Sequence, residues 1–112
     1  MTDMQLAGDN RDNRCNAGWV PPGAIVRVLK IVNQKGLHAR ASAKFVQTVE
    51  KFEVDVRVSR GNETVGGTSI MGLMMLAAGP GTEITVAASG RERAEVLLAL
   101  ELLVNERFGE DD

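Results

Sequence analysis

The spacing of apolar and polar residues predicts regular structure from residue 24 onward. Residues 24–32 are β-branched and apolar apart from Arg27 and Lys30, which predicts a strand covered on one face and partly shielded on the other. Residues 33–36 are polar and end in glycine, and they predict a turn. The next segment repeats small or apolar side chains at the spacing of one helix face, which predicts an amphipathic helix. The residues on that face are Ser42, Phe45, Val46, Val49 and Phe52.

A hairpin is predicted after this helix. Valine alternates with charged residues over residues 54–58, which predicts a strand with one buried face. The Arg-Gly-Asn sequence at residues 60–62 predicts a tight turn, because glycine and asparagine tolerate the backbone angles that short hairpin turns need. A short partner strand is therefore expected near residues 63–66.

The last third of the chain predicts helix, strand and helix. Ser69 stands at the N-cap position of a short helix over residues 70–78, which Gly79 closes with Pro80 beyond it. Residues 82–88 are rich in Thr, Ile and Val and predict a strand. Residues 91–108 contain neither Gly nor Pro and predict a long helix. Its apolar side consists of Leu97, Leu100, Val104 and Phe108.

The predicted order is βαββαβα. Short linkers and strands with one apolar face favour an antiparallel sheet with the helices packed on one side, an α+β architecture. Residues 1–23 show no periodicity and predict a flexible arm, residues 24–109 form the predicted domain, and residues 110–112 are an acidic tail. At 112 residues with 44% hydrophobic content, the chain has room for one domain.

Composition excludes several classes of function. A net charge of −2 and only four aromatic residues leave neither a basic surface nor a stacking platform for nucleic acid. The longest apolar stretch is interrupted by Gly72 and is too short to span a membrane. Cys15 is the only cysteine, which fits a reducing, cytoplasmic setting. His38 and Cys15 are too few for the usual zinc site, so we expect no metal.

The only histidine, His38, lies at a predicted strand-to-helix junction. The start of a helix carries unpaired backbone N–H groups and a partial positive charge, which together favour an anion. Arg40 adds a guanidinium whose geometry suits phosphate oxygens. A neutral imidazole is also a good nucleophile near neutral pH. The combination suggests a histidine that carries a phosphoryl group.

Two segments resemble the HPr family, the histidine-containing phosphocarriers of the bacterial phosphotransferase system. They are Gly36-Leu37-His38-Ala39-Arg40-Ala41-Ser42 and, about thirty residues later, residues 68–76. The resemblance covers residues 24–108 and implies four antiparallel strands with three helices on one face. It implies that His38 takes a phosphoryl group on Nδ1 from enzyme I, which is charged by phosphoenolpyruvate, and passes it to an enzyme IIA domain. No cofactor is implied, and the chain would be a carrier rather than a stand-alone enzyme.

The resemblance leaves the physiological output open between sugar uptake and the regulatory, nitrogen-related branch, whose members have a similar acidic end. One position departs from the family. Most HPr sequences have proline three residues after the active histidine, where this chain has Ala41. Alanine leaves one more N–H free at the helix start. We expect this difference to tune phosphoryl transfer without abolishing it.

Ser69 has two compatible interpretations. It is expected to cap a helix, and it also matches the serine that a dedicated HPr kinase/phosphorylase modifies in many relatives. In the helix that follows, Leu73, Leu76 and Ala77 are spaced for the core. The remaining residues are either core as well or part of a partner-docking surface, for which methionine is well suited. The candidate docking residues are Ala39, Ala43, Ile70, Met71 and Met74.

Two other functions compete with the carrier hypothesis. The first is a regulatory binding module controlled by Ser69 phosphorylation, with His38 idle. The second is a hydrolase with His38 as base, which lacks a nucleophile or carboxylate partner at recognisable spacing. A carrier must present one face to successive partners, so we expect a monomer.

Overall fold

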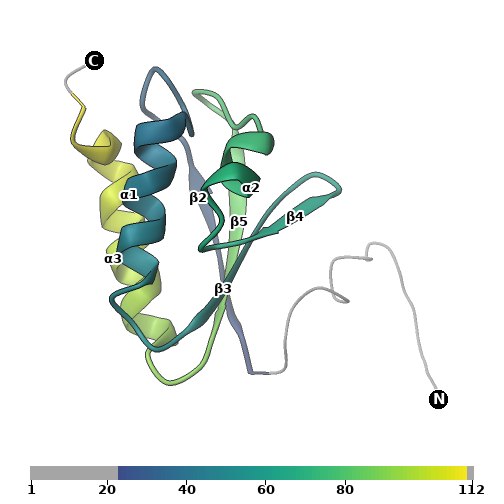
Figure 1. Ribbon diagram of the computed structural model, residues 1–112, viewed down its shortest axis with the longest axis vertical. Helices are drawn as coiled ribbons and strands as arrows, with labels where there is room; N and C mark the ends of the chain where they lie inside the picture. Colours follow the sequence, from purple (N-terminus) through teal and green to yellow (C-terminus); the bar gives the residue numbers. More distant parts are fainter. Residues whose placement is uncertain (1–22, 111–112) are drawn as a thin grey trace.

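The structure is a computed structural model that describes residues 23–110 (Figure 1). The predicted arm lies outside the described residues apart from Gly23, as does Cys15. The elements are β2 (Ile25–Lys30), α1 (Ala39–Val49), β3 (Asp55–Arg60), β4 (Glu63–Gly66), α2 (Ile70–Met75), β5 (Glu83–Ser89), α3 (Arg93–Asn105) and the 3-10 turn η2 (Arg107–Gly109). This order confirms the predicted βαββαβα arrangement.

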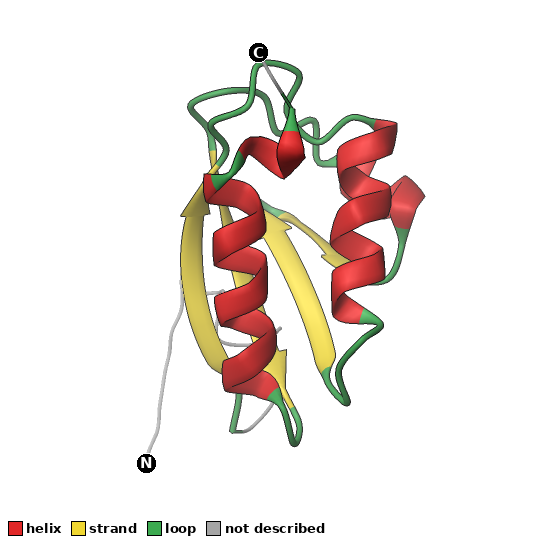
Figure 2. Ribbon diagram, turned by 90° about the vertical axis from the view of Figure 1, so that its left-hand side faces the viewer, coloured by secondary structure: helices red, strands yellow, loops and turns green. Residues whose placement is uncertain are grey.

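The four strands form one antiparallel sheet in the order β2-β5-β3-β4. β5 lies inside the sheet and pairs with β2 and β3, so Val86 is opposite both Arg27 and Val58. The three helices cover one face of this sheet, as predicted (Figure 2). No helix among residues 23–110 is long and apolar enough to cross a membrane.

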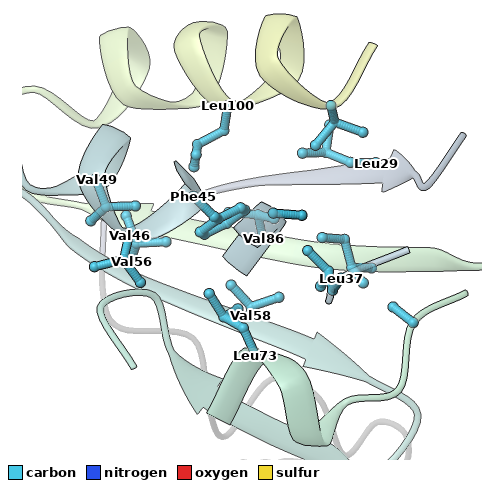
Figure 3. Packing of buried hydrophobic residues seen from close by; sticks show 14 of the residues in the cluster. Leu29, Leu37, Phe45, Val46, Val49, Val56, Val58, Leu73, Val86 and Leu100 are labelled. Atoms are coloured by element: carbon cyan, nitrogen blue, oxygen red, sulfur yellow. The ribbon is translucent and has the colours of Figure 1, made fainter. Parts of the chain in front are cut away.

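The core lies between the sheet and the helices (Figure 3). Phe45 is fully buried at its centre, and Val58, Leu73, Val86 and Leu100 are buried around it. Removing a side chain of this size from water contributes about 1.5–3 kcal/mol. The predicted stripe is the buried face of α1 from Ser42 to Val49, so the amphipathic assignment is confirmed there. Phe52, which the prediction placed on the same stripe, lies beyond the end of the helix and is half-buried.

The other face of the sheet is partly exposed at β2. Val28 is 57% exposed and Val26 is also exposed, whereas Leu29, which follows Val28, is buried. Because successive residues of a strand point to opposite faces, Leu29 faces the helices and the two valines face away from them. Part of each valine is still covered, which agrees with the expectation that this second face is partly shielded.

α2 ends earlier than predicted, at Met75 and not at residue 78. Ala77 adopts a left-handed conformation, with φ of 54°, and is exposed, so its assignment to the core is wrong. The turn buries Ala78 instead and presents the Ala78 carbonyl oxygen to the N–H of Leu37 at 3.0 Å. The chain therefore leaves the helical conformation at Ala77, two residues before Gly79.

The C-terminal helix is also shorter than predicted. α3 ends at Asn105, and Phe108 lies in η2, where Arg107 and Phe108 both have positive φ. Phe108 is nevertheless 1% exposed, so the prediction that it faces the core is confirmed. The ammonium of Lys44 on α1 donates a hydrogen bond to the Phe108 carbonyl oxygen at 2.5 Å. The C-terminal segment is thereby attached to the first helix.

Candidate functional site

His38 is the N-cap residue of α1, with extended backbone angles (φ −76°, ψ −178°). Its carbonyl oxygen accepts the hydrogen bond of the Ser42 N–H at 2.8 Å, which closes the first helical turn. Its side chain does not cap the helix. The N–H groups of residues 39–41 therefore have no acceptor within the helix or from the imidazole. A strand-to-helix junction with free amides beside the histidine is what the sequence predicted.

The loop before His38 is held in place by a second loop. Gly36 has a positive φ of 63°, and a Cβ there would lie 2.2 Å from the Ala78 carbonyl oxygen. Only glycine fits at this position, because both the backbone angle and the close approach exclude a side chain. An open hollow of 230 Å³ lies between the two loops, beside the imidazole. It is lined by Lys35, Leu37, His38, Ala77, Ala78 and Gly79.

The imidazole has a carboxylate partner that the sequence analysis did not find. Nε2 of His38 is hydrogen-bonded to Oε2 of Glu110, and their side chains are 27% and 12% exposed. The other carboxylate oxygen of Glu110 accepts a hydrogen bond from Nδ2 of Asn33 at 3.1 Å. The same Nδ2 donates to the Gly36 carbonyl oxygen at 2.9 Å. A buried asparagine thus links the histidine loop to the C-terminal segment.

The electrostatics of this pair favour an ionised carboxylate. Burial raises the pKa of the Glu110 carboxyl, but this effect is outweighed by the hydrogen bonds from His38 and Asn33 and by the charges of His38 and Lys35. The pKa of Glu110 is therefore below its ordinary value. At neutral pH the carboxylate is charged and acts as a hydrogen-bond acceptor only.

Backbone hydrogen bonds determine the position of Glu110. The Gly109 N–H donates to the Glu106 carbonyl oxygen at 3.0 Å, and the Glu110 N–H donates to the Arg107 carbonyl oxygen at 2.9 Å. Phe108 is buried between these turns. Residues 106–110 therefore fold back towards the start of α1, at the end of the molecule drawn at the top of Figure 1.

The first turn of α1 presents the other candidate residues. Arg40 is exposed and makes no hydrogen bond or ion pair with any residue among 23–110, so its guanidinium is available to an incoming anion. Ala39 is also exposed, and Ala43 is half-buried one turn further on. Ala41, where the family usually has proline, is fully buried.

Ser69 is the N-cap of α2, and its Oγ accepts a hydrogen bond from the Gly72 N–H at 3.0 Å. The predicted cap is confirmed. The residue is also exposed, so its hydroxyl is accessible from solvent.

The exposed side of α2 is apolar. Met71 is 70% exposed, and Ile70 and Met74 are each 40% exposed, so the alternative in which all of them belong to the core is wrong. Met75, which the sequence analysis did not single out, is 70% exposed as well. α2 packs against α1, the helix whose N-cap is His38 (Figure 1). No group of three or more His, Cys, Asp or Glu residues within 23–110 is placed to hold a metal.

The fold and the site define a small α+β protein that presents one histidine at a helix N-terminus beside an exposed arginine. Residues 25–106 match the family model described as the PTS HPr component phosphorylation site. The chain therefore belongs to the HPr family, the phosphocarrier proteins of the phosphotransferase system.

Individual relatives agree with this assignment. The phosphocarrier protein HPr of Neisseria meningitidis serogroup B is 49% identical over 84 residues, which cover 75% of this chain and 94% of that protein. The crystal structure of HPr-C-His from Thermoanaerobacter tengcongensis is similar with a TM-score of 0.75 and 38% identity, covering 79% of this chain and 99% of that one. An HPr dimer from the same organism gives a TM-score of 0.62 at 40% identity over 73% of this chain and 94% of that one.

Proposed function

We propose that this protein accepts a phosphoryl group from phospho-enzyme I onto His38 and passes it to an enzyme IIA domain. The output is sugar uptake or regulatory signalling. The observation that carries the proposal is the position of His38 at the start of α1, where three N–H groups lack helical acceptors and Arg40 is exposed. Membership of the HPr family supports the same reaction.

The chemistry follows from this arrangement. The Nδ1 lone pair of His38 attacks the phosphorus atom, and the bond between phosphorus and the donor group breaks as the new N–P bond forms, its electron pair leaving with the donor. The phosphoryl oxygens then lie near the positive end of the α1 dipole and the Arg40 side chain, both of which stabilise negative charge. The same stabilisation serves the reverse step, when the phosphoryl group leaves for the acceptor.

The proposed docking surface consists of Ala39, Ala43, Ile70, Met71 and Met74. These residues lie on α1, whose N-cap is His38, and on α2, which packs against α1. Flexible apolar side chains adapt to different partners, as a carrier between enzyme I and an enzyme IIA domain requires. We expect the protein to act in the cytoplasm. We also expect it to act as a monomer, because a stable dimer through this surface would block both partners.

Ser69 is a second candidate site, for regulatory phosphorylation by an HPr kinase/phosphorylase. Its exposure and its place at a helix N-terminus support the proposal, since a phosphate there does not disturb the helix. Added negative charge beside the exposed methionines of α2 is expected to weaken docking. In the competing function, Ser69 controls a binding module and His38 takes no part.

A phosphoryl relay tests the proposed function. The protein is charged with enzyme I and labelled phosphoenolpyruvate, purified from both, and mixed with enzyme IIA domains. We expect the label to move to at least one of these domains in the wild type and in Ser69→Ala, and not in His38→Ala. Relay through His38→Ala at the wild-type rate would contradict the proposal and favour the binding module.

A further inference from the structure

The proposed function assigns a role to Nδ1 of His38 but none to Nε2. In the structure, Nε2 is hydrogen-bonded to the Glu110 carboxylate. No residue among 23–110 forms a hydrogen bond with Nδ1. The two ring nitrogens are therefore in different environments before any phosphoryl donor arrives.

Neighbouring residues hold the Glu110 carboxylate in place. Asn33 is fully buried and divides its Nδ2 group between the Gly36 carbonyl oxygen and Oε1 of Glu110. The backbone of Glu110 is fixed by its hydrogen bond to Arg107, and the preceding Phe108 is buried in the core. Each carboxylate oxygen thus has a hydrogen-bond partner: Oε1 is bonded to Asn33 and Oε2 to His38.

This arrangement selects one tautomer of the imidazole. An ionised carboxylate accepts hydrogen bonds but cannot donate them, so the nitrogen facing Glu110 must carry the proton. The neutral ring then has its lone pair on Nδ1. A carboxylate that holds a histidine in one tautomer and orientation is a recurring device wherever histidine must act through its other nitrogen. The lowered pKa of Glu110 keeps the carboxylate charged at neutral pH.

We propose that Glu110 is a positioning residue for phosphoryl transfer, which holds the proton on Nε2 of His38 and so makes Nδ1 the nucleophile. This inference rests on the proposed function. In the step, the Nδ1 lone pair forms the bond to phosphorus and the bond from phosphorus to the donor breaks, its electron pair leaving with the donor group. The proton stays on Nε2, and Glu110 balances the positive charge that the ring gains. The phosphoryl group is then bound to Nδ1, on the side of the ring away from the carboxylate.

The test uses phosphoramidate, a small donor that phosphorylates histidine without any enzyme, on the full chain. The main variant is Glu110→Gln, which keeps the shape but has one oxygen for two donors, Asn33 and His38. Glu110→Ala is the second variant, and Glu106→Gln, an exposed position in the same segment, is the matched control. The rate of phosphorylation and the nitrogen that carries the phosphoryl group are measured by NMR, together with the tautomer of the unmodified ring.

We expect the wild type and Glu106→Gln to be phosphorylated on Nδ1 alone. In both Glu110 variants we expect the rate to fall about fivefold, the effect of losing one partly exposed ion pair. We also expect a mixed tautomer and part of the product on Nε2. A merely structural role for Glu110 would not move the product between ring nitrogens. Wild-type rate, tautomer and product in both Glu110 variants would overturn the inference.

The result is separable from the fate of the proposed function. Phosphoramidate needs no protein partner, so a dependence of the product on Glu110 supports the inference even if enzyme I fails to charge His38. Conversely, charging by enzyme I with no effect of either Glu110 variant on rate, tautomer or product would leave the carrier function intact and overturn the role of Glu110.

Discussion

Arg40 is the candidate residue at which an effect on the rate of phosphoryl transfer can be distinguished most clearly from an effect on folding stability. It is exposed and has no hydrogen-bonding or ionic partner among residues 23–110. We therefore expect Arg40→Ala to change the free energy of unfolding by less than about 0.5 kcal/mol. The same change is expected to slow phosphorylation by enzyme I about tenfold, because a charge-assisted hydrogen bond to phosphate is lost.

The matched control for Arg40 is Lys51→Ala, which removes one exposed positive charge just beyond the other end of α1. Timed phosphorylation assays measure the rate, and urea unfolding measures the stability. Equal rates for Arg40→Ala and Lys51→Ala would show that general charge, and not the position of Arg40, matters.

The lowered pKa of Glu110 predicts a pH dependence of stability. Its ordinary value is 4.5, and the hydrogen bonds from His38 and Asn33 and the charge of Lys35 bring the folded value below it. A group with a lowered folded pKa contributes stability above its unfolded pKa and loses it as pH falls through the folded pKa. We expect the extra stability of the wild type over Glu110→Gln to be present at about pH 5 and to disappear as pH falls further. Urea unfolding at a series of pH values checks this, and a difference that grows as pH falls below 4 would contradict it.

At the scale of elements, the sequence predicted what local periodicity determines. The buried stripe of α1 and the order of strands and helices follow from side-chain spacing alone. The end of α2 does not, because the chain turns at the left-handed Ala77, and the next residue, Ala78, contacts Leu37 in a separate loop. The contact between His38 and Glu110 joins residues 72 positions apart, and an acidic residue near a chain end gives no sign that it returns to the site. The apolar pattern that extends to Phe108 is the one feature of the sequence that indicates that the C-terminal segment packs against the core.

The left-handed residue after α2 provides a test at this scale. Ala77 has a φ of 54°, a conformation that costs a non-glycine residue about 1–2 kcal/mol. We expect Ala77→Gly to raise the free energy of unfolding by about 1 kcal/mol, since glycine adopts this conformation without strain but has a more flexible unfolded state. Urea denaturation measures it. Ala43→Gly, within α1, is the control and is expected to destabilise the protein by about 1 kcal/mol. Similar losses in both variants would contradict the account of Ala77.

At the scale of the whole molecule, the proposed function requires His38 and the exposed apolar face of α2 to meet the same partner. We expect Met71→Ala to weaken binding to enzyme I about fivefold or more, because a 70% exposed methionine that becomes buried on docking contributes at least 1 kcal/mol. Folding stability should hardly change. The control is Leu98→Ala on α3, where a leucine is 68% exposed and α1 separates it from α2 (Figure 1). Isothermal titration calorimetry compares the two, and equal affinities would exclude α2 from the docking surface.

The central claim is that His38 carries the phosphoryl group, and intact mass tests it most directly. Wild type, His38→Ala and Ser69→Ala are each weighed before and after incubation with enzyme I and phosphoenolpyruvate. We predict a gain of one acid-labile phosphate in the wild type and in Ser69→Ala and no gain in His38→Ala. An unchanged mass of the wild type beside an active enzyme I, or a phosphate that persists in His38→Ala, would contradict the account.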